Sequence, residues 1–374
     1  MFLTGCLIAL FSTSAFGAIP KINVLIGKSL DKVVIQGTDL KKTYSQSKQS
    51  HQYTGKKTIQ FSCDNPTAKS RFQKNTLIAH LSSPTGLVSW EDNKFQGDLK
   101  LIADPMKTRC NLVNEISLES YITTLLAKEM NGSWPVEALK AQAVAARTYA
   151  FERLKNKTAG KLYDLESSEK DQVSGTFFDI TDKTMKASKE TQGEILVGPK
   201  GRISPAFFHS KCGGKTLRPD QVWGGIEEGY KSVDCPFCAN KGRKDWTTKV
   251  KNEKILQLVD TVLKRYYSDQ IQDKDLKILP DSQLNSEVRL YVGDRLHIIK
   301  KSYLRNYAGR DLIPSNNFKM AMKGKEIHVH GQGYGHGVGL CQLGALELAQ
   351  RGYNYRQILA HYFPNHKVIT AYKQ

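Results

Sequence analysis

Residues 118–149 read LESYITTLLAKEMNGSWPVEALKAQAVAARTY and contain the clearest helical pattern in the chain. Apolar side chains recur at helical spacing from Leu118 to Leu126, and Ser117 is a suitable residue to cap the first turn. The Asn-Gly-Ser triplet at 131–133 predicts a break, after which Pro135 suits the first turn of a new helix. We therefore predict two consecutive helices, the second running from 134 towards 154.

The chain before these helices has the short apolar runs that are typical of β-strands. Such runs occur at Ile22–Ile26, Val33–Ile35, Leu77–Leu81 and Leu99–Ile102, and polar turns separate them. The Lys-rich segment between Lys41 and Lys57 is expected to be a solvated loop.

Further strands and helices follow the helix pair. Strands are predicted at 194–197, 288–292 and 296–299, and helices near 255–267, 343–350 and 355–363. Strands, then helices, then strands again indicate an α+β fold. We expect a β-rich N-terminal region over 18–94 and a main domain over 95–374, in which helices pack on a mixed β-sheet region and a flap at 209–238 is inserted.

Composition limits the class of protein. The 374 residues include 55 Lys and Arg against 36 Asp and Glu, which gives a formal net charge of +19. The shares of hydrophobic and charged residues are those of an ordinary globular protein, which excludes a disordered chain. No apolar run approaches the ~20 residues that are needed to cross a bilayer, which excludes a multi-span membrane protein. The charge predicts an anionic partner, either nucleic acid, an acidic polymer or an anionic envelope surface.

The N-terminus predicts export. Residues 1–11 are apolar and uncharged, and Ala15 and Gly17 supply the small side chains of a signal-peptidase site, so we predict a signal peptide over 1–17. A lipoprotein, suggested by the sequence before Cys6, and a membrane-anchored N-terminus are the alternatives. We expect the protein in the periplasm or cell wall, where anionic polymers and not nucleic acid would be its partners.

Two blocks of sequence resemble a known family. One is the helix pair at 118–149, and the other reads GQGYGHGVGLCQLGA at 331–345. Together they are similar to the SpoIID/LytB family, and the likeness extends from about Phe95 to Pro364, with Leu304-Arg305 and 315–318 also matching. The resemblance implies a lytic transglycosylase that acts on peptidoglycan glycan strands in a glycan-binding groove and prefers strands stripped of stem peptides.

Glu129 is the candidate catalytic residue. The family's Glu-Met-Pro motif maps onto it, although Asn131 replaces the proline here. The carboxyl extends the apolar stripe of Leu125 and Leu126, and partial desolvation there would favour the neutral form of a general acid. A glycosidase of the usual kind needs two carboxylates, whereas a lytic transglycosylase needs one and no cofactor. An ordinary glutamate at a helix end is the alternative.

Four other residues are candidate substrate contacts. Arg147 is either a surface charge or a bidentate ligand of a saccharide or carboxylate. His336 could orient a sugar hydroxyl or the catalytic acid, and Tyr334 and Gln342 could contact sugars. A non-catalytic wall-binding protein that recruits or stimulates a cell-wall amidase is the alternative function.

The cysteines allow two arrangements. His209, Cys212, Cys235 and Cys238 have the spacing of a structural zinc site. Some members of the family bind zinc earlier in the chain, but the comparable stretch here, 164–175, has neither Cys nor His. The other arrangement is disulfides, which an exported chain can form. Cys63 would then pair with Cys110, and Cys212 or Cys341 with Cys235 or Cys238.

Overall fold

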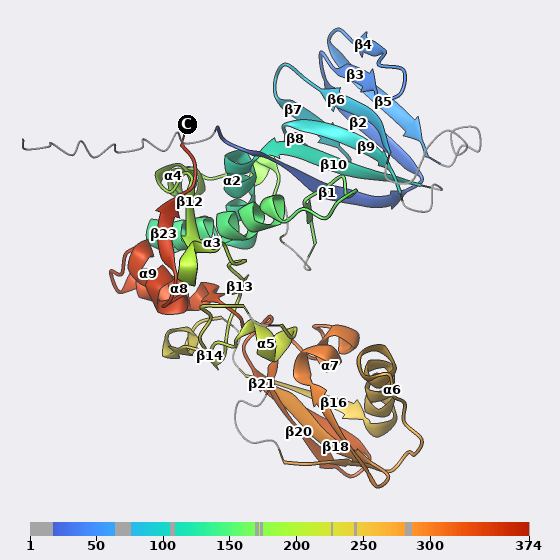
Figure 1. Ribbon diagram of the computed structural model, residues 1–374, viewed down its shortest axis with the longest axis vertical. Helices are drawn as coiled ribbons and strands as arrows, with labels where there is room; N and C mark the ends of the chain where they lie inside the picture. Colours follow the sequence, from blue (N-terminus) through green and yellow to red (C-terminus); the bar gives the residue numbers. More distant parts are fainter. Residues whose placement is uncertain are drawn as a thin grey trace, which may run out of the picture.

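The computed structural model describes residues 18–63, 76–104, 109–168, 172, 175–225, 227–242, 245–280 and 286–373. Figure 1 shows three parts, namely a strand-rich N-terminal part, a central helical part and a mixed part formed by residues 246–332. This arrangement confirms the predicted α+β class. The predicted signal peptide lies outside the described residues. Within them, no helix is both long and apolar enough to cross a bilayer.

The N-terminal part consists of two antiparallel sheets that enclose one core. The larger has the strand order β11-β1-β10-β9-β6-β3-β4, with β11 alone parallel to its neighbour, and the smaller has the order β5-β2-β7-β8. The strands are β1 (Lys21–Leu30), β2 (Lys32–Thr38), β3 (Lys41–Tyr44), β4 (Ser50–Gln52), β5 (Lys56–Ser62), β6 (Leu77–Ser82), β7 (Leu87–Trp90), β8 (Asn93–Gln96), β9 (Asp98–Ala103), β10 (Cys110–Ser117) and β11 (Leu165–Glu166).

Side chains alternate between the two faces of a strand, so one face of each sheet lies in this core. In β5, Ile59 and Phe61 are buried while their neighbours are exposed, and Leu99 and Leu101 of β9 face the same core from the other sheet. The predicted disulfide between Cys63 and Cys110 is present and joins the two sheets.

Two features of this part differ from the expectation. The segment from 41 to 57 is not a loop, because β3 and β4 form a hairpin at the edge of the larger sheet. Its side chains are mostly exposed, so no apolar alternation marks it in the sequence. The strands of the same sheet also continue past residue 94 to Ser117, where the first helix begins.

The central part is built around a long buried helix. It contains α2 (Leu118–Glu129), α3 (Val136–Lys155), α4 (Asp182–Glu190), α5 (Pro219–Val222), α8 (Gln342–Gln350) and α9 (Tyr355–Tyr362), the short turns η1 (Phe177–Asp179), η2 (Pro199–Gly201) and η3 (Pro236–Cys238), and the strands β12 (Glu194–Val197), β13 (Phe208–His209), β14 (Gly214–Lys215), β15 (Asp234–Cys235), β22 (Leu340–Cys341) and β23 (Lys367–Thr370). The small side chains of α3 let neighbours approach on two sides, since Ala143 and Ala146 belong to one core cluster and Ala141 and Ala145 to another.

The helix pair forms as predicted. Ser117 caps α2, because its side-chain oxygen accepts a hydrogen bond from the amide of Ser120. Pro135 occupies the N-cap position of α3, one residue earlier than expected. Glu137 in the first turn of α3 accepts hydrogen bonds from Lys140 and from the backbone amide of Tyr355, so it also supports the start of α9.

Arg147 of α3 is not a surface charge or a sugar ligand. Its side chain is fully buried, and the guanidinium donates two parallel hydrogen bonds to Glu119 of α2, at 2.9 and 2.8 Å. Further contacts reach the carbonyl oxygens of Glu194 and Ser188. Because its donors are used inside the protein, Arg147 is unavailable to a substrate, and the expected substrate contact is corrected to a structural ion pair.

The third part has its own hydrophobic core. It contains two three-stranded sheets, β16-β21-β20 and β17-β18-β19, with α6 and α7 contributing to the core between them. The elements are β16 (Trp246–Lys251), α6 (Asn252–Val262), the π-helical turn η4 (Leu263–Tyr267), β17 (Leu276–Ile278), β18 (Glu287–Val292), β19 (Arg295–Lys300), α7 (Lys301–Ala308), β20 (Asn317–Lys323) and β21 (Glu326–Gln332). The chain leaves the central part before β16 and returns through the Gly-rich segment after β21.

The double variant Cys63→Ser/Cys110→Ser should lower the free energy of unfolding by about 2–4 kcal/mol, because it frees a loop of 47 residues in the unfolded chain. Urea unfolding of the variant and the unaltered protein measures the difference. Equal stability would contradict a linking role for this disulfide.

Arg147→Met should lower the free energy of unfolding by about 3–5 kcal/mol, because it leaves the carboxylate of Glu119 largely buried without its main partner. Arg153→Met, on the same helix with a side chain that is 44% exposed, is the matched control and should change stability by less than about 1 kcal/mol. Urea unfolding again provides the measurement. If both variants lose the same free energy of unfolding, the ion pair of Arg147 and Glu119 does not hold the helices together.

Candidate functional site

Glu129 is the last residue of α2, where the helix gives way to extended backbone at Met130. The side chains one turn earlier, Leu125 and Leu126, are fully buried, and Met130 is also buried. Glu129 itself is partly buried, between this core and the surface. The position expected from the sequence, at the end of an apolar stripe, is therefore the one observed.

The Gly-rich segment comes from the far end of the chain and shares a hydrophobic core cluster with α3. Its strand β22 pairs in parallel with β13, so that Phe208 lies opposite Leu340 and His209 opposite Cys341. Gly339 has a positive φ of 73°, and a Cβ there would lie 2.1 Å from the backbone oxygen of Phe207. Only glycine permits this close approach, which fixes the path of the segment.

Gln342 joins the two blocks. It is buried, and its Nε2 donates a hydrogen bond to the backbone carbonyl of Glu129 at 3.5 Å, across 213 residues of sequence. Asn316 also reaches the segment, since its Nδ2 donates to the carbonyl of His336 at 3.0 Å. The structure therefore brings together three stretches singled out in the sequence.

His336 is held as a neutral imidazole. Its Nδ1 accepts a hydrogen bond from the amide of Val338 at 3.1 Å. Burial lowers the pKa of His336 well below 6.5, nearby His209 and Arg305 lower it further, and a backbone contact with Phe208 opposes them. The ring is thus uncharged near neutral pH and able to form hydrogen bonds without adding positive charge.

Trp223, which no sequence pattern singles out, packs beside His336. It lies at the end of α5 and is 41% exposed, with its ring centroid 5.1 Å from that of His336 and 4.6 Å from that of Phe207. A large aromatic ring that is partly exposed and supported from behind offers a flat apolar face. Its neighbours are distant in sequence, so no local pattern identifies this role.

Tyr334 lies beside the cysteine-bearing loop. Its backbone exchanges two hydrogen bonds with Lys211, at 2.7 and 3.1 Å, and its side chain is partly exposed. The direct sugar contacts expected of Tyr334, His336 and Gln342 stay predictions.

The expected metal ligands are rearranged. Cys212, Cys235 and Cys238 come together as predicted, but the fourth group beside them is Cys341 and not His209. His209 is buried elsewhere, with Nδ1 3.0 Å from the carbonyl oxygen of Val338 and its ring facing His336, 5.5 Å between centroids. Its backbone pairs in parallel with Cys341, but its ring nitrogens are not among the ligand atoms that lie within 4.8 Å of one another.

Two surface pockets of about 440 and 500 Å³ are prominent. The first is lined by residues of α2 and α4, including Glu119 and Lys189, and the second by residues such as Gly214 and Gln332. Neither lining includes Glu129, so the expected glycan-binding groove beside this residue stays a prediction.

Comparisons with known proteins match the block that contains the helix pair. The sequence profile of a family described as Stage II sporulation protein matches residues 106–197, which include the helix pair and Glu129. An uncharacterized protein of Brachyspira hyodysenteriae is 32% identical over 272 residues, covering 72% of this chain and 71% of that protein.

Two relatives from Bacillus subtilis carry descriptive names. Stage II sporulation protein D is 28% identical over 287 residues, covering 71% of this chain and 78% of that protein. The amidase enhancer is 26% identical over 299 residues, covering 66% of this chain and 40% of that protein. The profile match includes the helix pair and Glu129, and this chain belongs to the SpoIID/LytB family.

Proposed function

We propose that this protein acts on the bacterial cell wall as an exported peptidoglycan lytic transglycosylase, with Glu129 as its single acid and base. One observation carries the proposal. Glu129 lies at the point where α2 ends against a buried core and where Gln342 of the Gly-rich segment binds its backbone. The two family blocks therefore meet at the backbone of Glu129, a residue that is partly buried.

One carboxyl group is sufficient for this reaction. The protonated Glu129 gives its proton to the glycosidic oxygen, the bond from that oxygen to C1 of the muramic acid breaks, and the bonding electrons stay with the leaving oxygen. The resulting carboxylate then takes the proton of the muramic acid's own 6-hydroxyl, whose oxygen forms a bond to C1. The product is a 1,6-anhydro ring, water is not consumed, and Glu129 is protonated again.

Trp223 and His336 suit contact with a pyranose ring. His336 is uncharged near neutral pH, and its ring contacts that of Trp223 at a tilt, with 5.1 Å between centroids. The apolar face of a pyranose ring packs well on an exposed aromatic side chain, so we assign Trp223 to a sugar subsite. The net charge of +19 would hold the protein to anionic envelope polymers and does not take part in bond cleavage.

The name of one relative supports a second function. The amidase enhancer suggests a protein that binds the wall and stimulates an amidase without cleaving glycan. Such a protein would sediment with insoluble peptidoglycan and release no soluble glycan. Soluble 1,6-anhydro products distinguish the enzyme from the enhancer.

Glu129→Gln should reduce the release of 1,6-anhydromuramic products from peptide-free glycan strands at least about a hundredfold, because the amide cannot donate and then recover the proton. The matched control is Glu190→Gln, which alters an exposed glutamate that also ends a helix and should keep full activity. Mass spectrometry of the digest measures the products, and circular dichroism checks the fold. Undiminished cleavage by a folded Glu129→Gln protein would rule out the proposed role.

Trp223→Ala should weaken binding to peptide-free glycan about tenfold, because the sugar loses a stacking face worth roughly 1.4 kcal/mol. Tyr353→Ala removes a similarly exposed aromatic ring between α8 and α9 and serves as the control, with no change expected. Co-sedimentation with insoluble glycan gives both affinities. Equal affinities for the two variants would exclude a sugar subsite at Trp223.

A further inference from the structure

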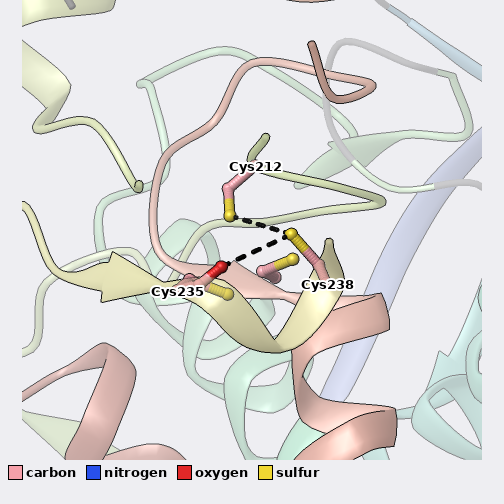
Figure 2. Close-up of side chains that lie close together, drawn as sticks. Cys212, Cys235 and Cys238 are labelled. Atoms are coloured by element: carbon pink, nitrogen blue, oxygen red, sulfur yellow. Dashed lines mark hydrogen bonds between the residues drawn. The ribbon is translucent and has the colours of Figure 1, made fainter. Parts of the chain in front are cut away.

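We infer that Cys212, Cys235, Cys238 and Cys341 bind one zinc ion as four thiolates. Their sulfur atoms all lie within 4.8 Å of one another, and the four side chains are buried. Figure 2 shows Cys212, Cys235 and Cys238 directing their sulfur atoms to a common point, with 3.4 Å between the sulfurs of Cys212 and Cys238. This set differs from the one expected from the sequence, because Cys341 replaces His209.

The spacing suits a tetrahedral site. A zinc–sulfur bond of about 2.3 Å places neighbouring ligands of a tetrahedron about 3.8 Å apart, within the range that these sulfurs span. Cysteines 63 and 110, by contrast, are joined as a disulfide in the same structure. Four thiols that all lie within 4.8 Å of one another suit a shared ion better than any one choice of two pairs.

The local backbone also resembles a closed metal site. Cys235 and Cys238 are the two ends of a Cys-Pro-Phe-Cys turn in which η3 brings both sulfurs to one side. Gly214 pairs with Cys235, and its backbone hydrogen-bonds to Cys238. Cys341 enters at the start of α8, beside η3. The ligands thus come from three separate segments, and four protein ligands leave no open position, as in structural zinc sites.

Two buried polar side chains lie where they can stabilise the negative charge of such a site. Four thiolates and one Zn²⁺ carry a net charge of −2, and Lys211, next to Cys212, is a buried cation. Its ammonium group donates to the carbonyls of Ala239 and Lys241, which follow Cys238, at 3.3 and 2.9 Å. The hydroxyl of buried Tyr362 lies 3.2 Å from the sulfur of Cys235, where it can donate to a thiolate.

The position of the site gives it a structural role. Cys212, Cys235 and Cys238 lie on the chain before it enters the third part at β16, and Cys341 lies after it returns from β21. The ion would therefore tie the two ends of residues 246–332 together. It would also fix the residue after Cys341, which is Gln342, against Glu129. This last consequence rests on the proposed function, whereas the metal site itself does not.

The test uses the full chain, produced with export and purified without chelators. We expect one zinc per chain by elemental analysis and native mass spectrometry, with peptides of these four cysteines recovered as free thiols. Replacement by Co²⁺ should give the absorption of a tetrahedral cobalt–thiolate complex. A chain with no bound zinc, in which peptide mapping finds these cysteines joined in disulfides, overturns the proposal.

Variants separate the four ligands from other residues. Cys341→Ser should lose the zinc and the cobalt spectrum, whereas Cys341→His should retain one metal ion, because Cys₃His is also a stable zinc site. Cys63→Ser/Cys110→Ser and His209→Ala should both keep full zinc content. Zinc retained by Cys341→Ser, or lost from His209→Ala in a folded protein, would contradict the assignment. These measurements need no glycan, so their failure would leave the role of Glu129 untouched.

Discussion

The carboxylate of Glu119 is the point on which the central part of this protein depends. It accepts two hydrogen bonds from the buried guanidinium of Arg147, a third from the amide of Gly193 at 3.0 Å and a fourth from the hydroxyl of Tyr372 at 2.6 Å. One group near the start of α2 therefore holds α3, the turn before β12 and the end of the chain. Removing a partner from a largely buried charge is costly, because the charge is then left uncompensated.

This arrangement positions the proposed reaction from a distance. Glu119 and Glu129 lie ten residues apart on α2, which corresponds to about 15 Å along a helix, so the ion pair does not touch the reacting group. It fixes the direction of the helix whose end presents Glu129. From the other side, Gln342 binds the Glu129 backbone, and the proposed zinc site would hold the neighbouring Cys341. The acid is thus supported by rigid elements on both sides, as a preorganised site requires.

The sequence predicted those features that local patterns encode. The cap at Ser117, the apolar stripe that ends at Glu129 and the alternation in the buried strands each involve near neighbours in the chain. Features that depend on distant partners were not predictable in this way. The role of Arg147 depends on Glu119, which lies 28 residues earlier, and nothing in the spacing of the two distinguishes a buried pair from a surface charge. Likewise, Cys341 has no short spacing to the other cysteines, and His209 was placed in the zinc set because its spacing to Cys212 fits a metal motif.

In the proposed reaction, Glu129 promotes an attack by the substrate's own 6-hydroxyl, and no water is consumed. Digestion of peptide-free glycan strands in water labelled with a heavy oxygen isotope tests this most directly, because hydrolysis places solvent oxygen on C1 of the newly formed muramic end. We expect 1,6-anhydro ends that carry no label. Reducing ends labelled with solvent oxygen would contradict it and would indicate a hydrolase with a second catalytic group.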